Sequence, residues 1–310
     1  MPDTTLIDRI RVAIAGVIRG KGEVIDRLLV AVLAGGHVLL EDVPGVGKTT
    51  LAKALARTFR VSFTRVQFTP DLLPADIIGA QVLKPQDGSF AFHRGPIFTH
   101  VFLADEINRA SPRTQSALLE AMNEDHVTVD GVTHPLPRPF MVLATQNPAD
   151  HHGTYPLPEA QLDRFLMRLC IGYPGTEEEL KMLAAHRTMS PVDAVEPVAE
   201  ADDLLGLQGQ VREVRVTEAV ARYMLNLVES TRRHKDIEIG VSPRGALALY
   251  RAAQAIALLA HRDYVSPDDV QAVAGVVLAH RVVLTAQARY GGVHPAALVE
   301  GIVRATAVPA

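Results

Sequence analysis

A glycine-rich segment near the amino terminus carries the residue types that bind phosphate. Its residues are Pro44, Gly45, Val46, Gly47, Lys48, Thr49 and Thr50. It lies between an apolar run at 37–40 and a helical pattern that begins near Thr49. Glycines let backbone N–H groups curve around an oxyanion, and a helix amino terminus adds positive dipole. Lys48 would reach the β and γ phosphates, and the Thr49 hydroxyl would serve Mg²⁺. The segment therefore predicts a nucleotide-phosphate loop.

One position departs from the general phosphate-loop pattern. The pattern begins with a glycine, and Asp42 stands at that place in this chain. The glycines at 45 and 47, the lysine and the threonine remain, and the predicted strand and helix flank them on the expected sides. We therefore keep phosphate binding as the interpretation of this segment.

Two adjacent carboxylates follow a second apolar run. Asp105 and Glu106 come directly after residues 100–104. Many strands end in a solvated acid, so the pair gains meaning only because a phosphate loop precedes it. Asp105 would hold the Mg²⁺ shell, and Glu106 would polarise the attacking water as a general base.

Asn147 and Arg164 are two further polar residues that could complete phosphate chemistry. Asn147 follows the run at 140–145 and would orient water beside the γ phosphate, although an asparagine before Pro148 also favours a turn. Arg164 lies just before the run at 165–171, near the domain rim, where it could serve a neighbouring subunit or pair with a nearby acid.

Arg244 occupies a position that helix electrostatics disfavours. It follows Ser242 and Pro243, which read as the cap and first residue of a helix, so the cation lies in the first turn. The helix dipole opposes this placement by about 0.3–1 kcal/mol. An arginine at such a place suggests an anionic partner, here a phosphate.

The elements that must position these residues follow from hydrophobic periodicity. Short apolar runs at 37–40, 63–68, 100–104, 140–145 and 165–171 alternate with helical patterns, as in a parallel sheet covered on both faces. Beyond residue 175 the apolar spacing is helical. The chain is therefore predicted to be an α/β protein, with a nucleotide-binding core at 1–174 and a helical lid at 175–310.

Two insertions interrupt the predicted core. The stretch 81–97 carries Asp87 and Gly88 between alternating apolar residues, and 127–136 carries Asp130 and Gly131 in the same way. Both patterns predict hairpins with type I′ turns that project from the sheet. Ordinary surface decoration is the alternative.

Composition restricts the class of protein. The 310 residues are 48% hydrophobic and 21% charged, with a net charge of −4, which is typical of a globular protein without a field for polyanions. The longest apolar run, 28–34, is far below the roughly 20 residues of a membrane span, and no signal peptide is recognisable. We expect a cytoplasmic protein.

Two potential metal or redox features read as structural. Cys170 is the one cysteine and ends an apolar run, so it is expected to be a buried strand thiol in a reducing compartment. His151 and His152 are adjacent on a predicted loop and would point apart, which favours a solvated turn over a metal site.

Several segments together resemble the MoxR family of AAA+ ATPases, over nearly the whole chain. The matching segments are 44–49, 67–74, 105–109, 114–122, 145–148, 162–165, 241–244 and 262–265. The family implies a core sheet with a small helical lid, ATP bound between them, and a ring, commonly of six subunits. It often replaces the first glycine of the loop, so Asp42 resembles a tolerated variant.

The resemblance also assigns roles. Lys48 and Thr49 would bind phosphate and Mg²⁺, Asp105 the metal, and Glu106 would activate water. Asn147 resembles the first sensor, Arg244 the second sensor, and Arg164 the arginine finger. Both predicted hairpins resemble insertions that face the ring's pore or its partner. Family members act as chaperones that mature other complexes, beside a protein with a von Willebrand factor A domain.

Two rival functions share the same nucleotide chemistry. A motor subunit of a chelatase-like or nucleic-acid-processing complex would contain this site, and so would a nucleotide-dependent scaffold with little turnover. The stretch 81–97 carries only Lys84 and Arg94 against Asp87, which argues against nucleic acid as a partner. Client identity, ring stoichiometry, and whether Arg244 serves its own or a neighbouring subunit stay open.

Overall fold

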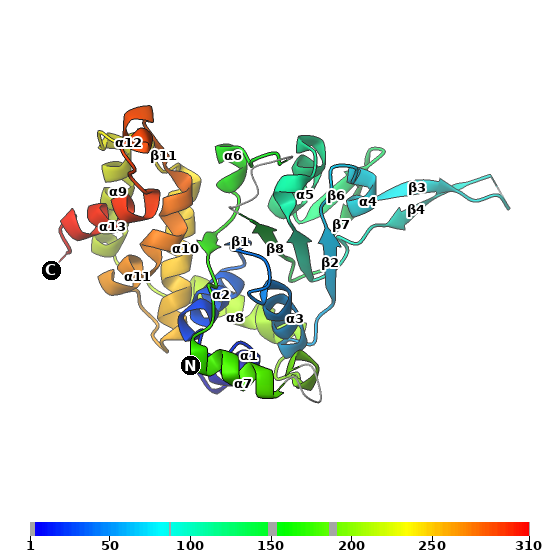
Figure 1. Cartoon of the computed structure of the whole chain (residues 1–310), viewed down its shortest axis with the longest axis horizontal. Coiled ribbons are helices and arrows are strands. Elements are labelled where there is room, and N and C mark those ends of the chain that lie inside the picture. Colours follow the sequence, from blue (N-terminus) through cyan, green and yellow to red (C-terminus); the bar gives the residue numbers. More distant parts are fainter. Residues whose placement is uncertain (1–3, 87, 148–153, 186–190, 310) are drawn as a thin grey trace.

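A five-stranded parallel sheet forms the centre of the amino-terminal part of the computed structural model, which describes residues 4–86, 88–147, 154–185 and 191–309 (Figure 1). The strand order is β2–β5–β8–β1–β9, and every neighbouring pair is parallel. The strands are β1 (Val38–Glu41), β2 (Phe63–Gln67), β5 (Val101–Asp105), β8 (Met141–Gln146) and β9 (Met167–Leu169). The predicted α/β class with five apolar strands is confirmed.

Alternation along the strands builds a core on each face of the sheet. In β1, Leu39 packs into one apolar cluster, whereas Val38 and Leu40 pack into the other. The cluster that contains Val38 and Leu40 also contains buried residues of three helices of this part of the chain and of the carboxyl-terminal helices, and α4 and α5 supply the opposite cluster. These helices are α1 (Thr4–Val17), α2 (Gly22–Leu33), α3 (Lys48–Thr58), α4 (Pro74–Ile78) and α5 (Pro112–Glu124). The two-sided cover explains why the strands read as continuous apolar runs.

The carboxyl-terminal part is helical, as expected; its later helices lie on the opposite side of the view from the β3–β4 hairpin described below, and its first two lie beside the helices of the amino-terminal part (Figure 1). Its α-helices are α7 (Thr176–Ala185), α8 (Ala201–Glu213), α9 (Glu218–Arg233), α10 (Pro243–Leu259), α11 (Pro267–Leu278), α12 (Ala286–Tyr290) and α13 (Pro295–Ala305). One antiparallel strand pair, β10 (Ile237–Ile239) with β11 (Val283–Leu284), joins them without a signal in the sequence pattern. Across the described ranges, no helix combines the length and apolar character that a membrane crossing demands.

Both predicted hairpins are present. β3 (Gly79–Leu83) pairs antiparallel with β4 (Phe90–Arg94), and β6 (His126–Val129) pairs with β7 (Val132–Pro135). Asp130 and Gly131 both have positive φ angles, as a type I′ turn requires, while Asp87 of the other turn lies outside the described residues. The β3–β4 hairpin extends far beyond the body of the molecule (Figure 1).

The predictions for Cys170 and for the pair His151 and His152 are not confirmed. Cys170 is exposed, because β9 ends at Leu169 and the thiol follows it, so the prediction of a buried strand thiol was wrong. Partial burial of the thiol and its hydrogen bond to the Asp42 carboxylate raise the pKa of the thiol, which favours its protonated form. His151 and His152 lie outside the described residues.

A buried carboxylate joins the ends of β1 and β9. Asp42 Oδ2 accepts hydrogen bonds from the N–H groups of Ile171 and Gly172, both at 2.7 Å, and Oδ1 accepts one from Val43 at 2.9 Å. Burial alone would raise the pKa of this carboxyl, but the hydrogen bonds from Gly172, Cys170, Ile171 and Val43 lower it. The residue that replaces the usual first glycine is therefore an anchor for the loop.

This anchor predicts a pH-dependent stability. A carboxyl whose folded-state pKa is lowered stabilises the fold above its unfolded pKa, about 3.9, and the contribution is lost as the pH falls through the folded pKa. At pH 7 we expect Asp42→Asn to lower the free energy of unfolding by about 2 kcal/mol, because several donors lose a charged acceptor. Below about pH 4 the difference in the free energy of unfolding between Asp42→Asn and the wild type becomes smaller.

Urea denaturation at pH 7 and at lower pH measures the difference in the free energy of unfolding between Asp42→Asn and the wild type. Asp202→Asn, at an exposed position in the first turn of α8, is the control and should change the stability by less than about 0.5 kcal/mol. Equal stability of Asp42→Asn and the wild type at pH 7, or a gap that widens on acidification, contradicts the anchoring role.

Candidate nucleotide-binding site

A cleft of about 360 Å³ opens at the carboxyl edge of the sheet. It gathers most of the residues that the sequence singled out, from the loop after β1, the end of β5 and the end of β8. Its lining comprises Pro44, Gly45, Gly47, Lys48, Thr49, Thr50, Arg65, Gln67, Asp105, Glu106 and Asn147. Val46 does not line the cleft and packs instead against the apolar core, which ties the loop down.

The backbone of the loop has the form expected for an anion site. Gly45 and Gly47 have φ angles of 86° and 96°, which only glycine adopts without strain. A side chain at either position would meet no atom within 4 Å, so the backbone itself faces open space. Gly47 is also the amino-terminal cap of α3 and offers no side-chain acceptor. The first N–H groups of α3 are thus left for an external oxyanion.

The ammonium group of Lys48 is held at this loop by carbonyl groups. Its Nζ donates hydrogen bonds to the backbone oxygens of Asp42 at 2.6 Å and of Val43 at 3.2 Å. Neutral carbonyls fix the position of the cation without cancelling its charge. The positive charge therefore remains available to an anionic ligand in the cleft.

Thr145 of β8 organises the two acidic residues. Its hydroxyl donates to Asp105 Oδ1 at 2.6 Å and accepts the backbone N–H of Glu106 at 2.8 Å. The other oxygen of Asp105 accepts from Arg65 Nε and a terminal nitrogen, at 2.9 and 2.7 Å. Both carboxylate oxygens of Asp105 are consequently oriented before any ligand binds.

Glu106 is held at the edge of the cleft in an unusual backbone conformation. Its φ angle is 56°, in the left-handed region that non-glycine residues seldom occupy. Its Oε2 accepts hydrogen bonds from Gln67 Nε2 at 2.7 Å and from Arg109 at 2.9 Å. The carboxylate is thus oriented by two donors and stays partly open to solvent, as a base that activates water requires.

Three residues escaped the sequence reasoning: Arg65 and Gln67 of β2, which line the cleft, and Arg109 of the short helix η1 (Ile107–Arg109), which bonds Glu106. Arg65 and Gln67 stand two positions apart, so they share one face of the strand. Gln67 also pairs in register with Asp105 of β5. This period of two in polar residues is the signal that could have identified Arg65 and Gln67. Asn147, which the sequence did single out, lies half-buried in the cleft just after β8.

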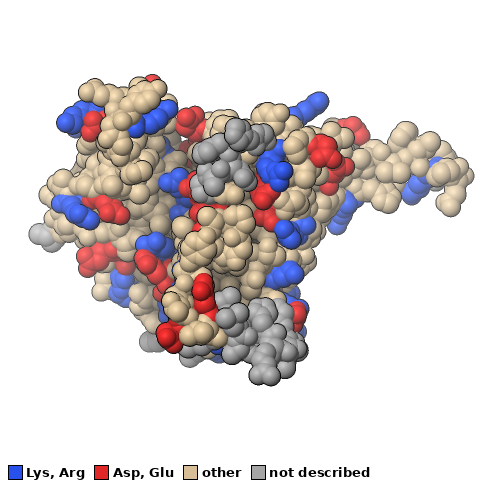
Figure 2. All heavy atoms as spheres, viewed as in Figure 1, with Lys and Arg blue, Asp and Glu red and all other residues tan. Residues whose placement is uncertain are grey.

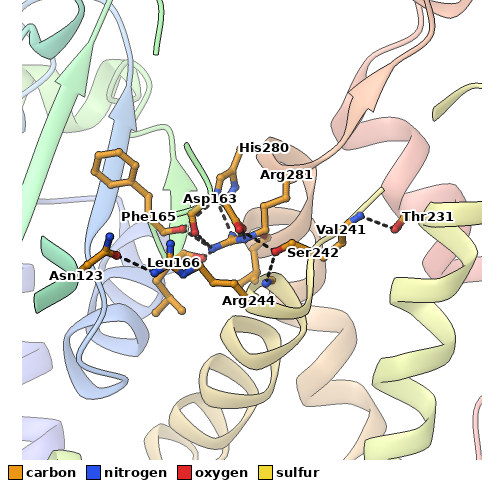
Figure 3. A network of polar contacts seen from close by, with 12 residues as sticks. Asn123, Asp163, Phe165, Leu166, Thr231, Val241, Ser242, Arg244, His280 and Arg281 are labelled. Atoms are coloured by element: carbon orange, nitrogen blue, oxygen red, sulfur yellow. Dashed lines mark hydrogen bonds and ion pairs between the residues drawn. The ribbon is translucent and has the colours of Figure 1, made fainter. Parts of the chain in front are cut away.

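The two remaining predicted residues lie together, away from the cleft. Arg164 donates to the carbonyl oxygen of Leu119. Arg244 donates to Asn123 Oδ1 at 2.9 Å (Figure 3). Both acceptors lie on the last turns of α5. Burial and the charge of Arg244 lower the pKa of Arg164, opposed by the acidic residue Glu120. Within the described part of the chain, Arg164 Nε is buried without a hydrogen-bond partner. The structure therefore forms one arginine pair, separate from the phosphate loop.

The donor set of the cleft fits Mg²⁺ bound with a nucleotide. Asp105 and the hydroxyl of Thr49 line the same space and offer the oxygen ligands that Mg²⁺ prefers, leaving further positions for phosphate oxygens. The described residues contain no group of three or more His, Cys, Asp or Glu side chains that could hold a metal by themselves. A metal here would depend on the nucleotide.

Comparison with known proteins agrees with this geometry. Residues 37–167 match the ATPase family associated with various cellular activities (AAA), and residues 229–302 match the AAA lid domain. The chain is 51% identical to protein YeaC of Bacillus subtilis, over 94% of this chain and 91% of that protein. It is 41% identical to chaperone MoxR1 of Mycobacterium tuberculosis, over 94% and 80% of the two chains.

Two further relatives extend the match. Protein MoxR of Paracoccus denitrificans is 34% identical over 88% of this chain and 87% of its own length. A crystal structure of a protein from Cytophaga hutchinsonii superposes with a TM-score of 0.92 at 38% identity, covering 99% of this chain and 96% of that one. The chain belongs to the MoxR family of AAA+ ATPases.

Proposed function

We propose that this protein hydrolyses Mg²⁺-bound ATP at the junction between subunits of a ring, and that hydrolysis remodels a protein client. One observation carries the proposal: the cleft unites the phosphate loop with Asp105 and Glu106, whereas Arg164 and Arg244 lie together outside it. A complete phosphoryl-transfer site needs cations at the leaving γ phosphate. Such cations would come from the arginine pair of a neighbouring subunit.

The residues of the cleft divide the work. Lys48 and the N–H groups at the start of α3 bind the phosphates, and Thr49 and Asp105 would hold Mg²⁺, which would neutralise phosphate charge. Glu106, oriented by Gln67 and Arg109, would take the proton of the attacking water. Asn147 would orient that water through its amide.

Separate variants distinguish binding from turnover. Lys48→Ala should weaken ATP binding about 10- to 100-fold, because it removes a charge that contacts the bound phosphates. Glu106→Gln should bind ATP with unchanged affinity and lower turnover at least about 100-fold, because only the base is lost. Fluorescent-nucleotide titration and phosphate release, with and without EDTA, measure both quantities.

Lys53→Ala is the matched control, since Lys53 is exposed on the same helix five residues beyond Lys48. It should leave binding and turnover unchanged. Normal turnover in Glu106→Gln, or turnover that persists in EDTA, would contradict the assigned chemistry.

The arginine pair is expected to act across a subunit junction. Arg164→Ala and Arg244→Ala should each bind ATP within about threefold of the wild type and lose about 10³-fold or more in turnover, as arginine fingers do. Mixing either variant with Glu106→Gln should restore activity, because a junction can then combine Glu106 of one subunit with the arginines of the other.

Mixtures of Lys48→Ala with Glu106→Gln are the negative control, since no junction in them holds both ATP and the base. Size-exclusion chromatography verifies that the subunits assemble together. Co-assembled mixtures of Arg164→Ala that stay inactive speak against action across the junction. Loss of ATP binding in Arg244→Ala alone would place this residue at the nucleotide of its own subunit.

The β3–β4 hairpin is the proposed contact with the client. Val82, Leu83 and Phe90 expose 46%, 52% and 68% of their surface near its tip. On the face that Figure 2 shows, uncharged side chains dominate the described part of the hairpin, and its basic residues form no stripe. Exposed apolar groups favour a protein surface, whereas a nucleic acid would require clustered lysine and arginine. The partner proposed from the family resemblance is a protein with a von Willebrand factor A domain.

Replacing the three apolar residues by serine tests this contact while keeping the hairpin. Basal turnover should stay within about twofold, and stimulation by a purified protein with a von Willebrand factor A domain should disappear. Tyr290→Ser, at a position 92% exposed in the lid, is the control and should keep the stimulation. Stimulation by DNA, or stimulation that survives the triple replacement, rejects the contact.

A further inference from the structure

The segment that carries Arg164 is clamped by one buried arginine of the lid. Arg281 belongs to η3 (Ala279–Arg281), and its side chain is 2% exposed. Its Nε donates to Asp163 Oδ1 at 2.7 Å, and its terminal nitrogens donate to the carbonyl oxygens of Asp163 at 3.2 Å, Phe165 at 2.6 Å, Leu166 at 3.1 Å and Val277 (Figure 3). All five N–H groups of the guanidinium therefore have acceptors.

This clamp requires arginine in its charged form. Burial lowers the pKa of Arg281 to about 10, which the Asp163 carboxylate opposes, so the side chain stays protonated at neutral pH. A lysine offers three donors from one atom and could not reach the same spread of acceptors. His280 contacts the Phe165 carbonyl from the same turn, and burial together with Arg281 keeps its pKa well below the usual range, so it adds no positive charge.

The second oxygen of Asp163 reaches the helix that carries Arg244. Ser242 Oγ donates to Asp163 Oδ2 at 2.8 Å, and the same hydroxyl accepts the N–H of Gly245 and caps α10. A Cβ at Gly245 would lie 2.8 Å from Arg281 Cδ, so the first turn of α10 packs closely against the side chain of Arg281. One carboxylate thus joins η3, the cap of α10 and the segment before β9.

Both functional arginines are next to this junction in the sequence. Arg164 follows Asp163, and Arg244 stands two positions after Ser242. The charge of Arg244 lowers the pKa of Arg164, so the two cations repel and the arrangement needs a rigid support that holds them together. Asp163 belongs to the segment of Arg164, and its carboxylate accepts hydrogen bonds from Ser242, the cap of the helix that carries Arg244, and from Arg281.

We propose that Asp163, Ser242 and Arg281 are positioning residues that hold Arg164 and Arg244 as one unit for catalysis at the neighbouring subunit's nucleotide. The inference rests on the proposed function, because it assumes that the arginine pair acts across the junction. It predicts that loosening the junction lowers the rate of the chemical step and leaves nucleotide binding in the variant's own cleft intact.

Ser242→Ala and Ser266→Ala form a matched pair for the first test. Both serines cap a helix, precede a proline and donate to an aspartate, but Ser266 bonds Asp269 within its own helix start and has no contact with Asp163. Both variants lose a comparable cap. We expect Ser242→Ala to lower kcat about tenfold or more with KM and ATP affinity within about twofold, and Ser266→Ala to change neither.

Ser242→Thr keeps a hydroxyl and should recover most of the lost kcat. Equal kcat values for Ser242→Ala and Ser266→Ala would overturn the proposal, because helix capping alone would then explain the serine. The same holds for a Ser242→Ala variant whose ATP affinity falls together with kcat.

Mixed assembly separates this inference from the proposed function. Asp163→Asn, mixed with Glu106→Gln, should regain turnover as the Arg164→Ala mixture does, because the defect lies in the arginines donated to the neighbour. If Arg164→Ala is rescued and co-assembled Asp163→Asn is not, the positioning role is wrong and the proposed function stands. If Arg164→Ala itself is not rescued, the proposed action across the junction fails.

Discussion

Parallel pairing of the central strands is the constraint on which the site depends. Because β1, β5 and β8 are neighbours that run in one direction, their carboxyl ends meet at a single edge of the sheet. The loop after β1, the acidic pair after β5 and Asn147 after β8 are brought together by that geometry alone. Thr145 then links two of these strands, since its hydroxyl bonds both acidic residues.

Local sequence signals account for the parts of the site that could be predicted. The glycines of the phosphate loop require positive φ angles, and the acids follow an apolar strand, so both features are visible without knowledge of the fold. Gln67 was not visible, because its place beside Asp105 depends on the register between β2 and β5. Cys170 was misjudged because the strand ends at Leu169, two residues before the end of the apolar run at 165–171.

The relation between the core and the lid was also beyond the sequence. Arg281 gives no pattern of its own, since its acceptors on Asp163, Phe165 and Leu166 are more than a hundred positions away. The disfavoured charge of Arg244 at a helix start did indicate an anionic partner, but not that a second arginine would share its surroundings. Tertiary packing determines which distant residues lie together, and local sequence preferences carry no information about it.

The left-handed backbone of Glu106 has an evolutionary consequence. A non-glycine residue in that region costs about 1–3 kcal/mol, which glycine would avoid. A single nucleotide change turns a glutamate codon into a glycine codon, and the resulting chain would relax its backbone while losing the carboxylate. Selection for folding would not remove such a chain. Glutamate at this position therefore keeps a carboxylate at the edge of the cleft at the expense of folding stability.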